Sequence, residues 1–153
     1  MNVVDSSCWL EYFAGSNVGD AVSGAIEDIP SLVVPSITLY EVFKKLLSET
    51  NEDQALLAVA HMRQGRVIEL DADLAIYSAK IGKVNKLALA YSIIYATSSK
   101  YDCTLWTQDQ HFKGLKAHLL PGENHVGYAE TCLPCQGAAK KILIGTESLL
   151  LML

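Results

Sequence analysis

The fold of this chain is decided by residues 32–48, which read LVVPSITLYEVFKKLLS. The apolar residues 32–34 predict a buried strand, and Pro35 ends it because proline lacks the N–H that a strand donates. Ser36 is predicted to cap a helix that runs to about Ser48, with its side-chain oxygen accepting from free backbone N–H groups. A short apolar strand that leads at once into a helix is the building block of α/β folds.

The same unit recurs along the chain. Further short strands are predicted at residues 2–4, 66–70 and 103–106. Further helices are predicted at residues 6–13, 18–28, 51–61, 71–82 and 87–101, with Asp71 capping the helix that Gly82 ends. Strands that alternate with helices imply right-handed βαβ units and a parallel sheet covered on both faces.

Length and composition favour one folded domain. The chain has 153 residues, and 50% of them are hydrophobic, which is enough for a packed core. Composition changes near Lys113, so we expect a domain over residues 1–120 and a C-terminal extension over 121–153, whose structure the sequence leaves open. No apolar run reaches the roughly 18 residues that span a bilayer, and the first residues do not resemble a signal peptide. We therefore expect a cytoplasmic protein without a membrane segment.

Charge and motif content narrow the classes of function. The net charge of −5 argues against a protein that coats nucleic acid with basic side chains, but metal-binding carboxylates would themselves make a nuclease acidic. Cys132 and Cys135 form a single pair, whereas zinc normally takes four ligands, and His111 is interpreted as a surface histidine. The chain has no Walker loop, GxGxxG or GxSxG motif, so the usual NTPase, dinucleotide and serine-hydrolase sites lack their parts.

Two acidic residues follow predicted strands directly. Asp5 comes after the first strand, and Asp109 lies just past the strand at 103–106, in a turn that also contains Thr107. In parallel sheets, ligands bind beyond the carboxyl ends of the strands. Each acid therefore has two interpretations, as a metal ligand or as the cap of the following helix.

Glu41 lies in the helix predicted after Pro35. The apolar stripe expected to face the core consists of Leu39, Phe43, Leu46 and Leu47. Glu41 falls on the opposite side, so periodicity alone favours a solvated glutamate paired with Lys45, four residues on.

The order of these segments resembles the PIN-domain family, most closely its VapC-type toxin branch. The resemblance runs from residue 1 to about 113 and rests on five segments: 3–9 with Asp5, 35–46 with Glu41, 70–82, 87–97, and 105–112 with Asp109. It implies a three-layer α/β/α sandwich around a central parallel sheet, and hydrolysis of RNA by an endoribonuclease. By the same resemblance, Asp5, Glu41 and Asp109 match catalytic acids that hold Mg²⁺ or Mn²⁺, and Ser6 and Thr107 match neighbours that orient substrate or water. The implied partners are an RNA substrate, a VapB-type antitoxin and a second copy in a homodimer.

One departure from the family pattern concerns the site itself. The family reads Leu-Pro-Leu-Ala-Asp where residues 87–91 read LALAY, so Tyr91 stands in place of an acid. Tyrosine is neutral at pH 7 and is a poor ligand for Mg²⁺. Two hypotheses remain open: a metal-dependent ribonuclease of weakened activity, or a catalytically silent module that binds an antitoxin or RNA. A different α/β metallohydrolase, such as a phosphatase, is disfavoured. Such an enzyme normally has an Asp-x-Asp pattern after its first strand, whereas residues 5–7 read DSS.

The second departure is the tail. About 40 residues follow Lys113, where the toxin branch usually ends after one more strand. Residues 118–120 are the expected position of that strand. Residues 140–153 are apolar enough to need a partner surface, either in the same chain or in another.

Overall fold

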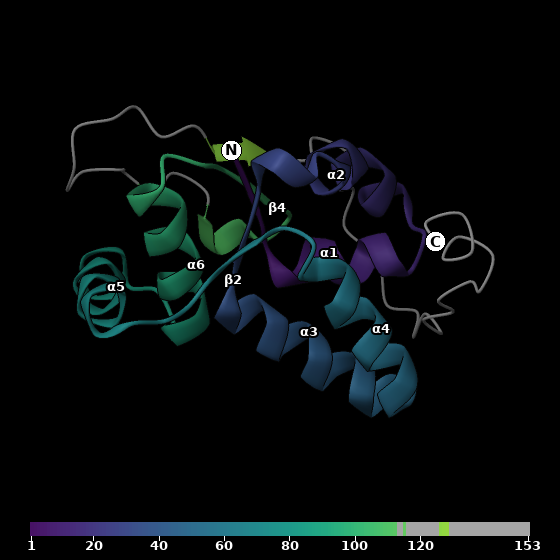
Figure 1. Ribbon diagram of the computed structural model, residues 1–153. Helices are drawn as coiled ribbons and strands as arrows, with labels where there is room; N and C mark the ends of the chain where they lie inside the picture. Colours follow the sequence, from purple (N-terminus) through teal and green to yellow (C-terminus); the bar gives the residue numbers. More distant parts are fainter. Residues whose placement is uncertain (113–114, 116–125, 129–153) are drawn as a thin grey trace.

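The computed structural model describes residues 1–112, 115 and 126–128, and its centre is a five-stranded sheet (Figure 1). The strands lie in the order β3-β2-β1-β4-β5, and every pair of neighbours is parallel. Their bounds are β1 (Asn2–Val4), β2 (Leu32–Pro35), β3 (Arg66–Ile68), β4 (Thr104–Thr107) and β5 (Val126–Tyr128). Parallel strands need crossover connections, and helices supply those from β1 to β2, from β2 to β3 and from β3 to β4.

Helices occupy most of the described chain between the strands. They are α1 (Ser6–Phe13), α2 (Asn17–Glu27), α3 (Ser36–Glu49), α4 (Glu52–Met62), α5 (Ala72–Asn85) and α6 (Leu89–Lys100), with short 3-10 turns η1 (Ile29–Ser31) and η2 (Gln110–Phe112). The six helices agree with the predicted ones to within a few residues at each end. No helix in the described part of the chain is long and apolar enough to cross a membrane.

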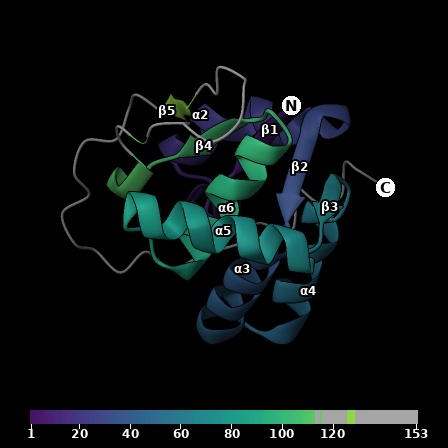
Figure 2. The same ribbon diagram turned by 90° about the vertical axis from the view of Figure 1, so that its left-hand side faces the viewer.

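The two faces of the sheet have separate cores. On β1, the buried Val4 packs with residues of α1, α2 and α4, whereas the buried Val3 packs with residues of α5 and α6. This alternation follows from the two-residue period of a strand. Figure 1 shows α5 and α6 on one side of the strands and α1 and α2 on the other, and Figure 2 shows α5 and α6 lying side by side. The predicted three-layer α/β/α sandwich is confirmed.

The prediction that Ser36 caps α3 is wrong. The N-cap is Pro35, and no side chain caps the first turn of this helix. Ser36 Oγ instead accepts from the backbone N–H of Leu70, at 3.3 Å. Leu70 follows β3, the strand paired with β2, so this hydroxyl is used by a segment 34 residues away in the sequence.

Gly82 does not end α5, contrary to the prediction. The helix continues to Asn85 and ends at Lys86, which takes a left-handed conformation with φ 56°. Gly82 lies instead where α5 meets α6, because a Cβ at this position would come within 3.0 Å of Ser92 Cβ. The glycine therefore serves close packing of two helices and not helix termination. Asp71 caps α5 as predicted, accepting from Leu74 N at 2.7 Å.

The C-terminal predictions are mostly outside the described residues. The strand expected at 118–120, the Cys132–Cys135 pair and the apolar segment 140–153 all lie there. One more strand does follow β4: β5 lies at Val126–Tyr128, pairs in parallel with β4 and ends the sheet.

Candidate active site

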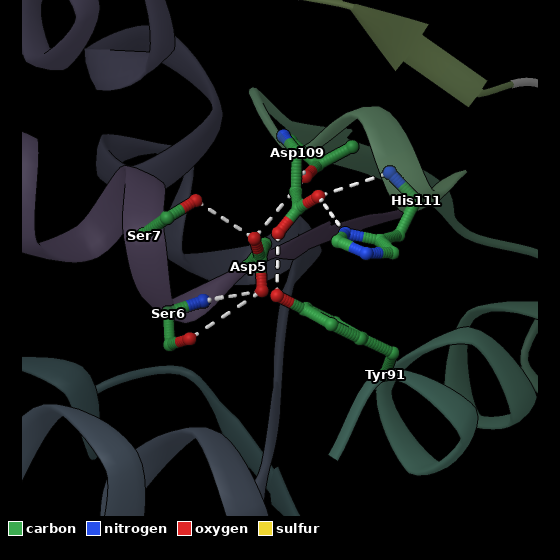
Figure 3. A network of polar contacts seen from close by, with 7 residues as sticks. Asp5, Ser6, Ser7, Tyr91, Asp109 and His111 are labelled. Atoms are coloured by element: carbon green, nitrogen blue, oxygen red, sulfur yellow. Dashed lines mark hydrogen bonds and ion pairs between the residues drawn. The ribbon is translucent and has the colours of Figure 1, made fainter. Parts of the chain in front are cut away.

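Asp5 and Thr107 are brought together because β1 and β4 are parallel neighbours in the sheet. Asp5 directly follows β1, and its backbone N–H donates to Trp106 O at 2.9 Å, which extends the ladder by one bond. Thr107 ends β4, and Asp109 lies two residues beyond it. The carboxyl ends of adjacent strands therefore place these side chains at one edge of the sheet, as Figure 3 shows for the two acids.

The Asp5 carboxylate is buried and fully engaged in hydrogen bonds. Its side chain is 1% exposed. Oδ1 accepts from Ser6 N at 2.8 Å, which makes Asp5 the N-cap of α1, and Oδ2 accepts from Ser7 Oγ at 2.8 Å and Thr107 Oγ1 at 3.1 Å. Burial raises the pKa of Asp5 above its ordinary value, the charge of Asp109 adds to the rise, and these hydrogen bonds oppose it. The interpretation of Asp5 as a helix cap is therefore correct, and the same carboxylate also bonds to the side chains of Ser7 and Thr107.

Each oxygen of the Asp109 carboxylate is bonded to a different aromatic side chain (Figure 3). Oδ2 accepts from the Tyr91 hydroxyl at 2.5 Å, and Oδ1 accepts from His111 N at 2.9 Å and lies 2.5 Å from His111 Nδ1. Burial alone would raise the pKa of Asp109, but the hydrogen bonds from His111 and Tyr91 bring it below its usual value. The hydrogen bond to Asp109 raises the pKa of Tyr91, so the phenol stays protonated and remains a donor.

Glu41 comes from α3 and is half-buried, so the predicted solvated position is wrong. Lys45 forms its ion pair with Glu49 and not with Glu41. Burial raises the pKa of Glu41, a hydrogen bond with the Ser6 side chain lowers it, and the charge of Asp5 raises it further. Ser6 thus links Glu41 to Asp5. The stripe that faces the core also differs from the prediction, because Leu47 is 45% exposed.

The structure therefore gathers the predicted site residues around Asp5. Thr107, Ser6 and Asp109 are part of this group, and Tyr91 reaches it from the first turn of α6.

Sequence reasoning missed two members of the group, Ser7 and His111. The side chain of His111 is 66% exposed, in keeping with a surface histidine, yet it bonds to Asp109 and stacks on Tyr91. The signal for both was local, since Ser7 lies two residues after Asp5 and His111 two residues after Asp109.

The donor set has the chemistry of a site for a hard cation. The carboxylates offer only oxygen atoms, and burial, with a smaller contribution from a neighbouring acid, raises the pKa of Asp5 and that of Glu41. Within the described residues, neither of these two acids forms an ion pair with Lys or Arg. Mg²⁺ prefers such oxygen ligands and relieves such repulsion. In the same part of the chain, no three His, Cys, Asp or Glu side chains already form a compact metal cluster, so loading would require some rearrangement.

Comparison with known proteins agrees with this architecture. The sequence profile of the PIN domain family matches residues 3–117, whereas no curated protein sequence matches the chain significantly. The fold is similar to that of a toxin–antitoxin complex from Klebsiella pneumoniae, with 23% identity, a TM-score of 0.63, and coverage of 80% of this chain and 99% of the other. It is also similar to DNA-bound VapBC from Salmonella typhimurium, with 14% identity, a TM-score of 0.63, and coverage of 84% and 97%.

A third similar structure is a sarcin–ricin-loop-cleaving VapC toxin from Mycobacterium tuberculosis, with 17% identity, a TM-score of 0.58, and coverage of 72% of this chain and 91% of the other. At these sequence identities, the similar structures show only that the fold is shared. The family profile matches residues 3–117, which is most of the chain. The chain therefore belongs to the PIN domain family.

Proposed function

We propose that this chain is a metal-dependent endoribonuclease, the toxin component of a VapBC-type pair, with activity weakened by Tyr91. The observation that carries the proposal is the network at the carboxyl edge of the sheet, in which Thr107 bonds to Asp5 and to the backbone of Asp109, and Ser6 links Asp5 to Glu41. The similar structures support it, since they include toxin–antitoxin complexes and a sarcin–ricin-loop-cleaving toxin.

In this proposal, Asp5, Glu41 and Asp109 would hold Mg²⁺ or Mn²⁺. A divalent cation at these acids would polarise the scissile phosphate and lower the pKa of the attacking water. The hydroxyls of Ser7 and Thr107 fix the Asp5 carboxylate, and Ser6 bridges it to Glu41. These hydroxyls therefore restrain both carboxylates, which would limit the freedom that they lose on binding a cation.

The proposed partners follow from the same acidic edge. An antitoxin would insert an arginine, because a guanidinium pairs well with carboxylates and Asp5 and Glu41 have no basic partner in the described residues.

We also propose a homodimer and a cytoplasmic location. The location is supported by Cys8 and Cys103, which are free thiols within the described part of the chain, because cysteines stay reduced in the cytoplasm. The nuclease domain is proposed to cover residues 1–120 together with β5, which pairs with β4 in the same sheet, and the rest of residues 121–153 is proposed to be an extension.

One observation favours a second candidate, a catalytically silent PIN-fold module that binds an antitoxin or RNA. The Tyr91 hydroxyl donates to Asp109 at 2.5 Å, so one acid of the group is already bonded within the protein. A site closed in this way could bind a basic partner without cutting RNA.

Cleavage of RNA in Mg²⁺ or Mn²⁺ separates the two candidates. The proteins to compare are the chain as it stands, Tyr91→Asp, Asp5→Asn and the control Asp20→Asn, an exposed acid on α2. Slow cleavage by the chain, its loss in Asp5→Asn and its retention in Asp20→Asn would support the nuclease. Cleavage by Tyr91→Asp alone would favour the silent module, and cleavage that survives in Asp5→Asn would reveal a contaminating nuclease.

A further inference from the structure

The Tyr91 ring is held in place by contacts that do not involve its hydroxyl. It stacks on His111 with ring centroids 5.0 Å apart and an interplanar angle of 19°. It also meets the edge of Phe112, which is 0% exposed, at 5.3 Å and 84°. The position of the hydroxyl is therefore set by packing of the ring, and the ring would stay in place if the hydroxyl were removed.

The hydroxyl occupies the one oxygen of Asp109 that His111 leaves free. Oδ1 is shared by two nitrogens of His111, whereas Oδ2, among the residues that the structure describes, accepts only from Tyr91, at 2.5 Å. The oxygens of Asp5 accept from Ser6, Ser7 and Thr107. Asp109 Oδ2 is thus the oxygen at which a cation and a tyrosine would compete directly.

We propose that Tyr91 is an internal competitor for the cation, a neutral donor that occupies Asp109 Oδ2 and must be displaced before metal binds there. The inference rests on the proposed function, because it concerns the metal site of the nuclease. A phenol that donates to a carboxylate relieves part of its charge without adding a counter-ion. The tyrosine thereby performs part of the task that the cation would perform, and it lowers the affinity for metal.

The competition has an expected size. Hydrogen bonds to charged groups contribute enough free energy to change an equilibrium by roughly 10- to 100-fold. Tyr91→Phe removes the hydroxyl and keeps the stacked ring, so it should tighten Mg²⁺ and Mn²⁺ binding by about that factor. Tyr91→Asp should bind at least as tightly, since it also adds a negative charge.

Calorimetric titration of the full chain with MgCl₂ or MnCl₂ tests this without any measurement of cleavage. The matched control is Tyr40→Phe, because Tyr40 is 58% exposed on α3 and lies outside the acidic group. We expect Tyr40→Phe to bind metal like the unmodified chain. A second readout is the tyrosine absorption difference on adding Mg²⁺, which should appear in the unmodified chain and in Tyr40→Phe and be absent from Tyr91→Phe. Tyr91→Leu removes the same hydroxyl and serves if Tyr91→Phe does not fold.

Two results would overturn the inference, and they differ in what else they remove. If Tyr91→Phe binds metal no more tightly than the unmodified chain while Tyr91→Asp binds tightly, the competition is wrong and the metal site of the proposed function stands. If none of the four proteins binds Mg²⁺ or Mn²⁺, both the inference and the proposed metal site are wrong.

Discussion

Replacing Asp5 with asparagine should abolish cleavage and leave the protein as stable as before, or more stable. Asp5 is 1% exposed, and burial raises its pKa in the folded state above the unfolded value. The folded state then binds the proton more tightly than the unfolded state, so stability is lost as pH rises through the folded pKa. At neutral pH the ionised carboxylate works against folding, and a neutral amide removes that cost.

The size of the effect comes from the three donors around Asp5. Asparagine retains an oxygen for Ser6 N, and its amide nitrogen can donate to the hydroxyls of Ser7 and Thr107, which accept as well as donate. Asp5→Ala instead loses the cap of α1, at about 1 kcal/mol. It also leaves the hydroxyls of Ser7 and the fully buried Thr107 without their acceptor, at about 1 kcal/mol or more each. We therefore expect Asp5→Ala to be about 3 kcal/mol less stable than Asp5→Asn.

Urea unfolding at pH 7, followed by tryptophan fluorescence, measures this difference. With a dependence of about 1.5–2 kcal/mol per molar urea, the midpoints of Asp5→Asn and Asp5→Ala should differ by about 1.5–2 M. The matched control is Asp71, an exposed N-cap that accepts from Leu74 N at 2.7 Å. Asp71→Ala should cost about 1 kcal/mol, the value of a cap alone. If Asp5→Asn is as unstable as Asp5→Ala, the ionised carboxylate itself stabilises the fold and the argument from burial is refuted.

Three further outcomes follow from the structure. Burial lowers the pKa of His61 in the folded protein, so the unfolded chain binds the proton more tightly and the free energy of unfolding should decrease between pH 7 and pH 5. The decrease should be smaller in His61→Phe, and an equal decrease would contradict a buried neutral imidazole. In α2, a Cβ on Gly19 would lie 2.5 Å from Glu11 O, so Gly19→Ala should be destabilised by about 2 kcal/mol or more in thermal unfolding. A Cβ on Gly24 would meet nothing within 4 Å, so Gly24→Ala should be stabilised by about 0.5–1 kcal/mol. Lys86→Gly should gain up to about 1 kcal/mol in the same measurement, because Lys86 has φ 56° and glycine adopts that conformation without strain; no gain would contradict this.

Local patterns predicted the fold well because the decisive signals lie within a few residues of one another. The strand at β2 is an apolar run closed by a proline, and Asp71 caps α5 through the backbone N–H of Leu74, three residues on. The errors have the opposite character. Ser36 looked like a cap, but its hydroxyl bonds to Leu70, 34 residues away, and Gly82 looked like a helix end, but it makes room for Ser92 of a neighbouring helix.

The site shows the same division. The positions of Asp5 and Asp109 followed from strand ends, which parallel pairing brings to one edge. The contact between Thr107 and Asp5 spans 102 residues, and that between Tyr91 and Asp109 spans 18, so neither can be deduced from spacing on one element. Glu41 was misplaced because its helix packs with a different stripe from the one that periodicity suggested: the buried residues are Thr38, Val42 and Leu46.

The tyrosine divides the electrostatics of the site into two unequal halves. Around Asp109, hydrogen bonds from Tyr91 and His111 bring the pKa below its usual value, so its negative charge is already stabilised. Around Asp5 and Glu41, burial and the neighbouring charges raise both pKa values, and hydroxyl groups offset only part of the rise. The negative charges of Asp5 and Glu41 are therefore less fully compensated within the protein than that of Asp109. In the proposed metal site, a variant that frees Asp109 from Tyr91 would therefore add a ligand next to β4, whereas a variant that removes Asp5 would take away a ligand whose charge is less fully compensated.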